Sequence, residues 1–137
     1  LKKLKINLKK REINFRNHSN FLKKYSNYFI LPKQLPGSRS GWLAYPITIK
    51  NNAPFSRTEM QIFLEKNNIQ TRPIFSGNIL RHPGFSNLTS KRNNINEFKE
   101  SDYIMKNGLL IGCHQGLNKK NLDYIHQTIR RFLKNKN

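Results

Sequence analysis

Residues 53–78, APFSRTEMQIFLEKNNIQTRPIFSGN, decide the predicted fold, because they place a capped helix directly before a strand. Ser56 and Glu59 have the spacing of a capping box, in which each side chain pairs with a backbone N–H of the other residue. Phe55 precedes the cap, and an apolar face follows it at helical spacing. The pattern predicts a helix over residues 56–67.

Alternating and apolar runs on either side of this helix predict three strands. Residues 42–49 alternate between two faces, and Pro46 indicates a sheet edge or a bulge. Residues 69–75 form the second strand, and the apolar run 109–111 forms the third. Because each strand is followed by a helical pattern, the predicted fold class is α+β, a small three-stranded sheet covered by helices.

The other helices are predicted from apolar periodicity. The last helix covers residues 119–134, and residues 95–107 show partly helical spacing after an irregular loop at 76–94. Residues 1–22 form one long amphipathic helix, or two helices with a break near Asn14. The apolar stripe of this segment is narrow and lacks Trp, so we expect it to pack on another domain rather than on anionic lipid.

The boundary of the compact unit is placed near residue 40. Residues 28–36 are apolar and contain two prolines, which favours an extended crossing over a helix. The sequence GSRSG at 37–41 follows as a turn or linker. We therefore predict a linking helix and extended segment over residues 1–40 and a compact domain over residues 41–137.

The net charge of +19 is typical of nucleic-acid-binding proteins. The charge is spread along the chain, however, with +8 on residues 1–24, +6 on 25–118 and +5 on 119–137. Lysine, asparagine and isoleucine make up 50 of the 137 residues, and all three have A/T-rich codons. A base-composition bias therefore explains the lysine content, and a basic nucleic-acid-binding protein stays as an alternative.

Few residues could carry catalysis or bind a metal. The four histidines are far apart in the sequence, and Cys113 and His114 are strand neighbours whose side chains point to opposite faces. The seven carboxylates show no spacing that suggests acid–base catalysis, and the common phosphate-binding and nucleophile motifs do not occur. We predict no catalytic residue and no metal site in this chain.

The chain has one cysteine, which excludes an internal disulfide bond. It also has no apolar run near the ~20 residues of a membrane span. The expected location is the cytoplasm.

The stretch most suggestive of a ligand surrounds Arg72. Alternation in the strand 69–75 places Arg72 on the face opposite Thr71. Burying a guanidinium requires an anion, and its planar fork suits a phosphate or a carboxylate. Asn78, a few residues later, offers both a donor and an acceptor. The structural alternative is an ion pair between Arg72 and a helix carboxylate.

Three segments carry a resemblance to a known family: residues 20–50, NFLKKYSNYFILPKQLPGSRSGWLAYPITIK; residues 53–85, APFSRTEMQIFLEKNNIQTRPIFSGNILRHPGF; and residues 111–125, IGCHQGLNKKNLDYI. Together they resemble the C-terminal region of the CDP-4-keto-6-deoxyglucose 3-dehydratases, which belong to the sugar aminotransferase (DegT/StrS) family of fold-type I pyridoxal phosphate proteins. The helix start PFSR and the segment TRPIFSGN are the most specific parts. The resemblance covers nearly the whole chain apart from about the first ten residues.

The resemblance implies the small C-terminal domain of such an enzyme, with a long N-terminal linking helix. The parent enzyme would remove the 3-hydroxyl of a nucleotide-linked keto-deoxy sugar in dideoxysugar and lipopolysaccharide O-antigen biosynthesis. Pyridoxal or pyridoxamine phosphate would be held by a large domain, in the same parent chain or separately encoded. This chain, as a C-terminal fragment, would hold no cofactor and would be inactive alone.

The resemblance also implies that Arg72, Asn78 and Arg81 bind the nucleotide-sugar substrate, because they would face the active-site cleft. Lys119 and Lys120 depart from the family pattern, which has acidic residues in the first turn of the last helix. A sugar-nucleotide aminotransferase stays open as an alternative, as does a homodimeric parent enzyme.

Overall fold

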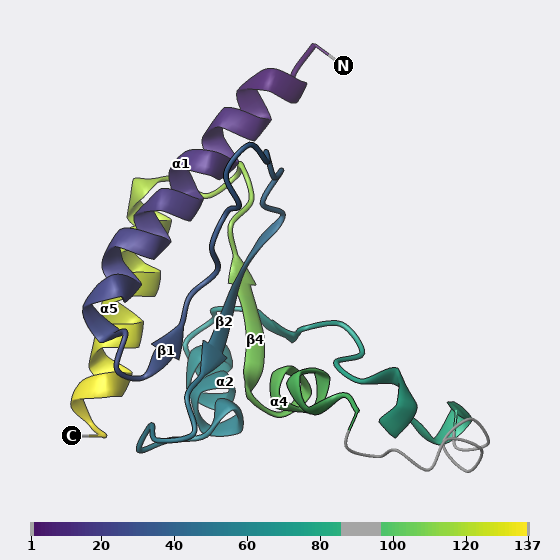
Figure 1. Ribbon diagram of the computed structural model, residues 1–137. Coiled ribbons are helices and arrows are strands. Elements are labelled where there is room, and N and C mark those ends of the chain that lie inside the picture. Colours follow the sequence, from purple (N-terminus) through teal and green to yellow (C-terminus); the bar gives the residue numbers. More distant parts are fainter. Residues whose placement is uncertain (1, 86–96, 137) are drawn as a thin grey trace.

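The computed structural model describes residues 2–85 and 97–136, and its strands form one antiparallel sheet flanked by helices (Figure 1). The strands are β1 (Phe29–Ile30), β2 (Ala44–Ile49), β3 (Thr71–Pro73) and β4 (Gly108–Gly112), in the spatial order β1-β2-β4-β3. The helices are α1 (Leu4–Leu22), α2 (Arg57–Lys66), α4 (Lys99–Asn107) and α5 (Lys119–Lys134). The α+β class and the three predicted strands are confirmed.

β1 is a fourth strand that the sequence analysis did not predict. It lies at one sheet edge, where Phe29 pairs with Ile49 and Ile30 pairs with Thr48. A strand of two residues is too short to show an alternating pattern. β2 therefore lies between β1 and β4. In the described chain, however, only Thr48 and Ile49 of β2 pair with β1, so Pro46 has a paired neighbour on the β4 side alone. This position suits a residue without a backbone N–H.

The core lies between the sheet and three helices, α1, α2 and α5. Tyr45, Ile47 and Ile49 of β2 are at most 1% exposed, and so are Leu109 and Ile111 of β4 on the same face. Figure 1 shows α1 and α5 on one side of β2 and β4, with α4 on the other. The regular alternation of β2 therefore separates a core face, covered by α1, α2 and α5, from the face on the side of α4.

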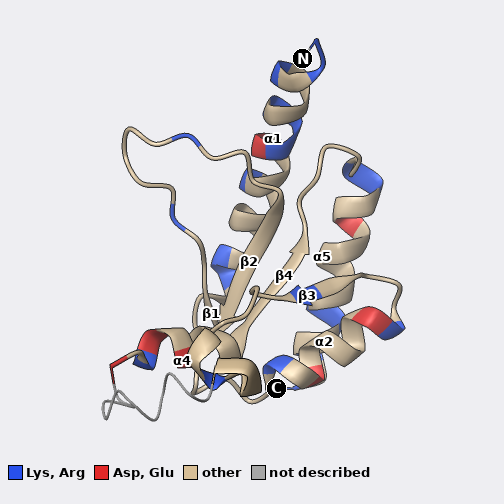
Figure 2. Cartoon of the chain, turned by 90° about the vertical axis from the view of Figure 1, so that its right-hand side faces the viewer, with Lys and Arg blue, Asp and Glu red and all other residues tan. Residues whose placement is uncertain are grey.

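α1 is one continuous helix, so the predicted alternative of a break near Asn14 is wrong. Its second half packs into the core through Asn14, His18, Phe21 and Leu22. Its first half extends beyond the remainder of the domain, as Figures 1 and 2 show, and Leu4 is 50% exposed. The predicted apolar stripe is therefore buried mainly at its C-terminal end.

Local capping accounts for the firm boundaries of α2 and α5. The predicted helix over residues 119–134 is confirmed, and Asn118 and Asn121 form a reciprocal capping box at its start. Its first turn contains Lys119 and Lys120 and no acidic residue, so the helix dipole does not favour these charges. The two capping hydrogen bonds pair backbone N–H groups that have no carbonyl partner within the helix.

The segment between β3 and α4 contains two short 3-10 turns, Ile79–Arg81 and Pro83–Phe85. The predicted loop at 76–94 agrees with these turns as far as residue 85, and its remaining part lies outside the described residues. The predicted helix at 95–107 is confirmed from Lys99 onward.

Removal of the α2 cap tests the helix start. Ser56 Oγ accepts the Glu59 backbone N–H at 3.2 Å, and the Ser56 N–H donates to Glu59 Oε2 at 2.8 Å. We expect Ser56→Ala to lower the free energy of unfolding by about 1 kcal/mol in urea denaturation followed by circular dichroism. Thr58→Ala, at an exposed position of the same turn, should change it by less than about 0.5 kcal/mol. Equal losses in the two variants would show that the cap contributes nothing.

Candidate functional site

The sheet face opposite the core presents Arg72. In β3, Thr71 is 2% exposed and lies on the core side, so alternation turns Arg72 outward beside Leu110 of β4. This orientation confirms the predicted face for Arg72. The predicted strand at 69–75 is shorter in the structure, because it ends at Pro73, and Phe75 lies beyond it with φ of 45° and 89% exposure.

Arg72 lines a pocket of about 410 Å³ between β3, the end of β4 and the N-terminal half of α5. Its apolar lining includes Leu43, Leu110 and Leu117, and its polar lining includes Asn68, Gln70, His114 and Tyr124. Among the residues that the structure describes, no lysine and no carboxylate lines this pocket. The guanidinium is therefore the only permanent charge in its described lining.

On α2, the carboxylate nearest in sequence to Arg72 is that of Glu65, and it is hydrogen-bonded to Thr71. Glu65 Oε1 accepts the Thr71 backbone N–H at 2.6 Å and the Thr71 hydroxyl at 2.8 Å. These two hydrogen bonds lower the pKa of Glu65, and the charge of Arg72 adds the smallest contribution. None of the ion pairs within residues 2–85 and 97–136 involves Arg72. The alternative of an ion pair with a helix carboxylate is therefore not found there.

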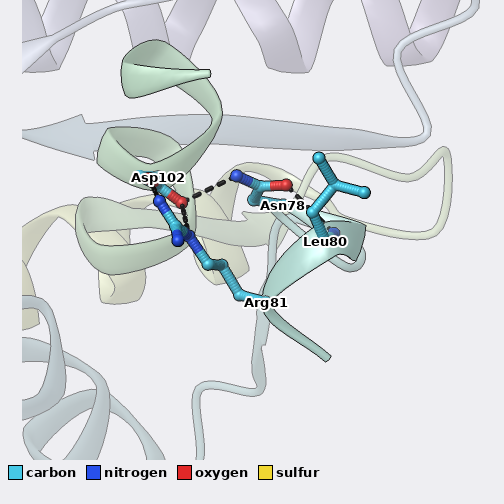
Figure 3. A network of polar contacts seen from close by, with 4 residues as sticks. All are labelled: Asn78, Leu80, Arg81 and Asp102. Atoms are coloured by element: carbon cyan, nitrogen blue, oxygen red, sulfur yellow. Dashed lines mark hydrogen bonds and ion pairs between the residues drawn. The ribbon is translucent and has the colours of Figure 1, made fainter. Parts of the chain in front are cut away.

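Asn78 and Arg81 meet at Asp102 of α4 (Figure 3). Arg81 Nε donates to Asp102 Oδ1 at 2.9 Å, and Arg81 Nη2 donates to Oδ2 at 2.5 Å. Asn78 is 5% exposed; its Nδ2 donates to Asp102 Oδ1 at 2.8 Å, and its Oδ1 accepts the Leu80 N–H at 3.1 Å. The hydrogen bonds from Arg81 and then Asn78 lower the pKa of Asp102 to about 2.

The three predicted substrate-binding residues thus fall into two groups. Arg72 lines the pocket, whereas Asn78 and Arg81 belong to a network that fastens the segment after β3 to α4. Asp102 is the member that the sequence analysis missed. It lies 21 positions after Arg81, and no periodic pattern joins residues that far apart.

Loss of the Asp102 carboxylate should release this segment. In Asp102→Ala the Arg81 side chain loses both bonds to Asp102, so trypsin should cleave after Arg81 roughly three to ten times faster. Glu100→Ala removes an exposed carboxylate from the same helix and serves as the matched control. The rates would be followed by mass spectrometry of the products. A rate at Arg81 that rises equally in both variants would contradict a fastening role for Asp102.

Two histidines that are 108 positions apart meet in the interior. His18 Nδ1 lies 3.0 Å from His126 Nε2, and His18 Nε2 lies 2.9 Å from the Gly112 carbonyl oxygen. Because a carbonyl only accepts, neutral His18 carries its proton on Nε2, and His126 Nε2 donates to His18 Nδ1. No spacing in the sequence connects these two histidines. Within the described residues, no group of three or more His, Cys, Asp or Glu side chains could hold a metal ion.

The positive charge is spread in three dimensions as it is in sequence. Figure 2 shows Lys and Arg on α1, α2, α5 and the long connection between β1 and β2. In the described part of the chain, no helix is both long and apolar enough to span a bilayer.

Comparison with known proteins places these features in context. The model of the DegT/DnrJ/EryC1/StrS aminotransferase family matches residues 1–130. The lipopolysaccharide biosynthesis protein RfbH of Salmonella typhimurium is 31% identical over 125 residues, which cover 91% of this chain and 28% of RfbH. The dTDP-4-dehydro-2,6-dideoxy-D-glucose 3-dehydratase of Saccharopolyspora spinosa is 33% identical over 104 residues, which cover 76% of this chain and 22% of that protein.

Comparison with a solved structure shows a similar fold. The E. coli GDP-4-keto-6-deoxy-D-mannose-3-dehydratase with bound hydrated PLP matches with a TM-score of 0.77 at 24% identity, over 93% of this chain and 32% of that one. The chain therefore spans between 22% and 32% of the length of these three proteins.

Proposed function

Because the chain belongs to the DegT/DnrJ/EryC1/StrS aminotransferase family, we propose that it forms the small domain of an enzyme that removes the 3-hydroxyl of a nucleotide-linked 4-keto-6-deoxy sugar. Residues 1–40 would connect it to a large domain, and residues 41–137 would be the small domain. The observation that carries this proposal is the relative that is 33% identical and is named as a 3-dehydratase of such a sugar.

The finer parts of the proposal concern substrate and pathway. We propose a CDP-linked 4-keto-6-deoxyglucose as the substrate and the cytoplasm as the location. The name of the Salmonella relative supports a role in lipopolysaccharide biosynthesis, and the dideoxysugars of O-antigen are the products that fit a 3-dehydration.

The described lining of the pocket around Arg72 does not fit a pyridoxal phosphate group. The pocket lining holds neither a lysine for a Schiff base nor a carboxylate for the pyridine nitrogen. We therefore assign pyridoxal or pyridoxamine phosphate to a large domain, in the same parent chain or separately encoded. We assign no proton transfer to a residue of this chain.

The role of this chain is to bind and orient the substrate. Arg72 offers a guanidinium without an ion partner in the described residues, which suits a phosphate group. Asn78 and Arg81 form part of the substrate-facing wall in this proposal, and their bonds to Asp102 hold that wall in place. The exposed first half of α1 is the surface on which a large domain would pack.

The proposal is tested by expressing the chain together with the protein encoded immediately upstream of it in the source DNA. We expect the two to co-purify and to turn over CDP-4-keto-6-deoxyglucose with pyridoxamine phosphate, and we expect the chain alone to be inactive. Arg72→Ala in the complex should raise KM for the sugar roughly tenfold. Turnover by the purified chain alone, or a large domain that neither binds nor restores activity, would overturn the proposal.

One observation favours a second candidate, because the matching family is named for aminotransferases. A sugar-nucleotide aminotransferase would transfer nitrogen from an amino donor to the sugar. Mass spectrometry of the product separates the two reactions, since dehydration removes oxygen whereas transamination introduces nitrogen.

A further inference from the structure

The pocket that Arg72 lines also contains His114, whose imidazole can donate a hydrogen bond. His114 Nδ1 accepts the Gly116 backbone N–H at 3.2 Å. The proton of the neutral imidazole therefore lies on Nε2, which becomes a donor. A Cβ atom built on Gly112 of the pocket wall would lie 3.9 Å from this Nε2. The free edge of the imidazole is thus beside the pocket wall.

The backbone around His114 is fixed from the interior. The His114 carbonyl accepts Asn14 Nδ2 at 2.8 Å and the Leu117 N–H at 3.2 Å. Asn14 is 4% exposed and belongs to the half of α1 that packs in the core. The His114 side chain is exposed, and it lies on an anchored turn, which is an arrangement that holds a donor in place for a ligand.

The pocket combines donors with apolar walls. Leu43, Leu110 and Leu117 supply apolar surface, and Arg72 and His114 supply N–H groups. Its volume of about 410 Å³ falls within the range typical of small-molecule sites. No carboxylate within residues 2–85 and 97–136 lines it, and the net charge of +19 attracts anions to the whole chain.

We infer that this pocket binds the diphosphate group of a nucleoside diphosphate, with Arg72 and His114 Nε2 as its two donors and the leucines against the nucleoside. The identification of the ligand as part of a nucleotide sugar rests on the proposed function. The anion-binding property rests on the pocket itself. His114 thereby becomes a substrate-binding residue in addition to those predicted from the sequence.

The inference is tested by calorimetric titration of the purified chain with CDP, inorganic pyrophosphate and cytidine at a fixed salt concentration. We expect CDP and pyrophosphate to bind and cytidine to bind at least about tenfold more weakly. Arg72→Ala should weaken CDP binding by about tenfold, and His114→Ala by roughly three- to tenfold. His114→Gln, whose amide can donate in place of Nε2, should stay within about threefold of the original chain.

Arg16→Ala is the matched control, because it removes the same charge from an exposed position on α1 outside the pocket. Equal losses in Arg16→Ala and Arg72→Ala would overturn the inference, because binding would then follow overall charge. Absence of saturable CDP binding, or equal binding of cytidine and CDP, would overturn it as well. Unchanged thermal unfolding midpoints would confirm that these variants are folded.

The same variants separate this inference from the proposed function. If the complex with a large domain turns over the sugar equally well with and without Arg72 and His114, the pocket assignment fails and the function stands. If pyrophosphate binding depends on Arg72 but no complex turns over the sugar, the pocket stands and the function fails.

Discussion

Gly77→Ala is expected to lower the free energy of unfolding by about 3 kcal/mol, from backbone strain together with overpacking. Gly77 has φ of 63°, and a Cβ atom built on it would lie 2.3 Å from Met105 Cβ and 2.7 Å from Met105 Cα. Because Met105 belongs to α4, relief of the contact requires movement of the helix backbone or of the turn. The turn also carries Asn78, so its movement should break the hydrogen bond to Asp102.

Two other glycines separate strain from contact in this experiment. Gly37 has φ of 75° and a built Cβ atom there meets nothing within 4 Å, so Gly37→Ala should cost about 1 kcal/mol from backbone strain alone. Gly84 has neither a positive φ nor a close neighbour, so Gly84→Ala should change stability by less than about 0.5 kcal/mol. All three would be measured by urea denaturation. A loss in Gly77→Ala no larger than in Gly37→Ala would show that the contact with Met105 is harmless.

The elements that could be predicted from sequence are those whose signals are local. The α2 capping box needs only Ser56 and Glu59, three positions apart, and the α5 face repeats within sixteen residues. In the same way, the alternating pattern around Thr71 was enough to predict that Arg72 faces away from the core. Such signals act within one or two turns of a helix or along one strand, so the sequence displays them directly.

The features that could not be predicted depend on residues that are distant in sequence. β1 is defined by the pairing of Phe29 with Ile49, and it is too short to show an alternating pattern in the sequence. The ion pair between Arg81 and Asp102 joins a loop to a helix 21 positions later. Asn78 illustrates the consequence for the site, because its type suggested ligand binding while its amide is bonded internally to Asp102 and Leu80.

The buried pair of His18 and His126 leads to the second large expected effect, a loss of stability in mild acid. Burial lowers the pKa of His18 to about 4, the neighbouring His126 adds to this shift, and the bond to the Gly112 carbonyl opposes it. Burial likewise lowers the pKa of His126 to about 4, while Asp123 raises it and Arg130 lowers it further. Phe21 stacks on the His126 ring at 4.2 Å between centroids and keeps water from that face.

The sign of the effect follows from where the proton binds more tightly. The unfolded chain takes up the proton near the ordinary histidine pKa of 6.5, whereas the folded chain resists it until about pH 4. Stability should therefore be complete above pH 6.5 and should fall as the pH drops from 6.5 to 4. For His18, which is fully buried, the loss amounts to about 3 kcal/mol. The other groups around the pair on β2 and α1, Tyr45 and Ser19, bond to each other.

The carboxylates Asp102 and Glu59 titrate at lower pH than the histidine pair, so they do not disturb a measurement of stability between pH 6.5 and 4.5. Asp102 and Glu59 have their pKa lowered to about 2, so their contribution is present above about pH 4.5 and is lost below that value. Asp102→Asn should therefore leave the slope of stability between pH 6.5 and 4.5 unchanged.

His126→Gln is the informative variant, because the Gln amide can still donate to His18 Nδ1 while one titrating group is removed. Its stability should fall less steeply between pH 6.5 and 4.5 in urea denaturation measured at several pH values. When His18 takes up a proton, its Nδ1 also carries hydrogen and no longer accepts the hydrogen bond from residue 126. The pH dependence of stability that remains in His126→Gln should therefore come from protonation of His18. A slope identical to that of the original chain would mean that the proton uptake in this range occurs elsewhere and that the pair does not control acid stability.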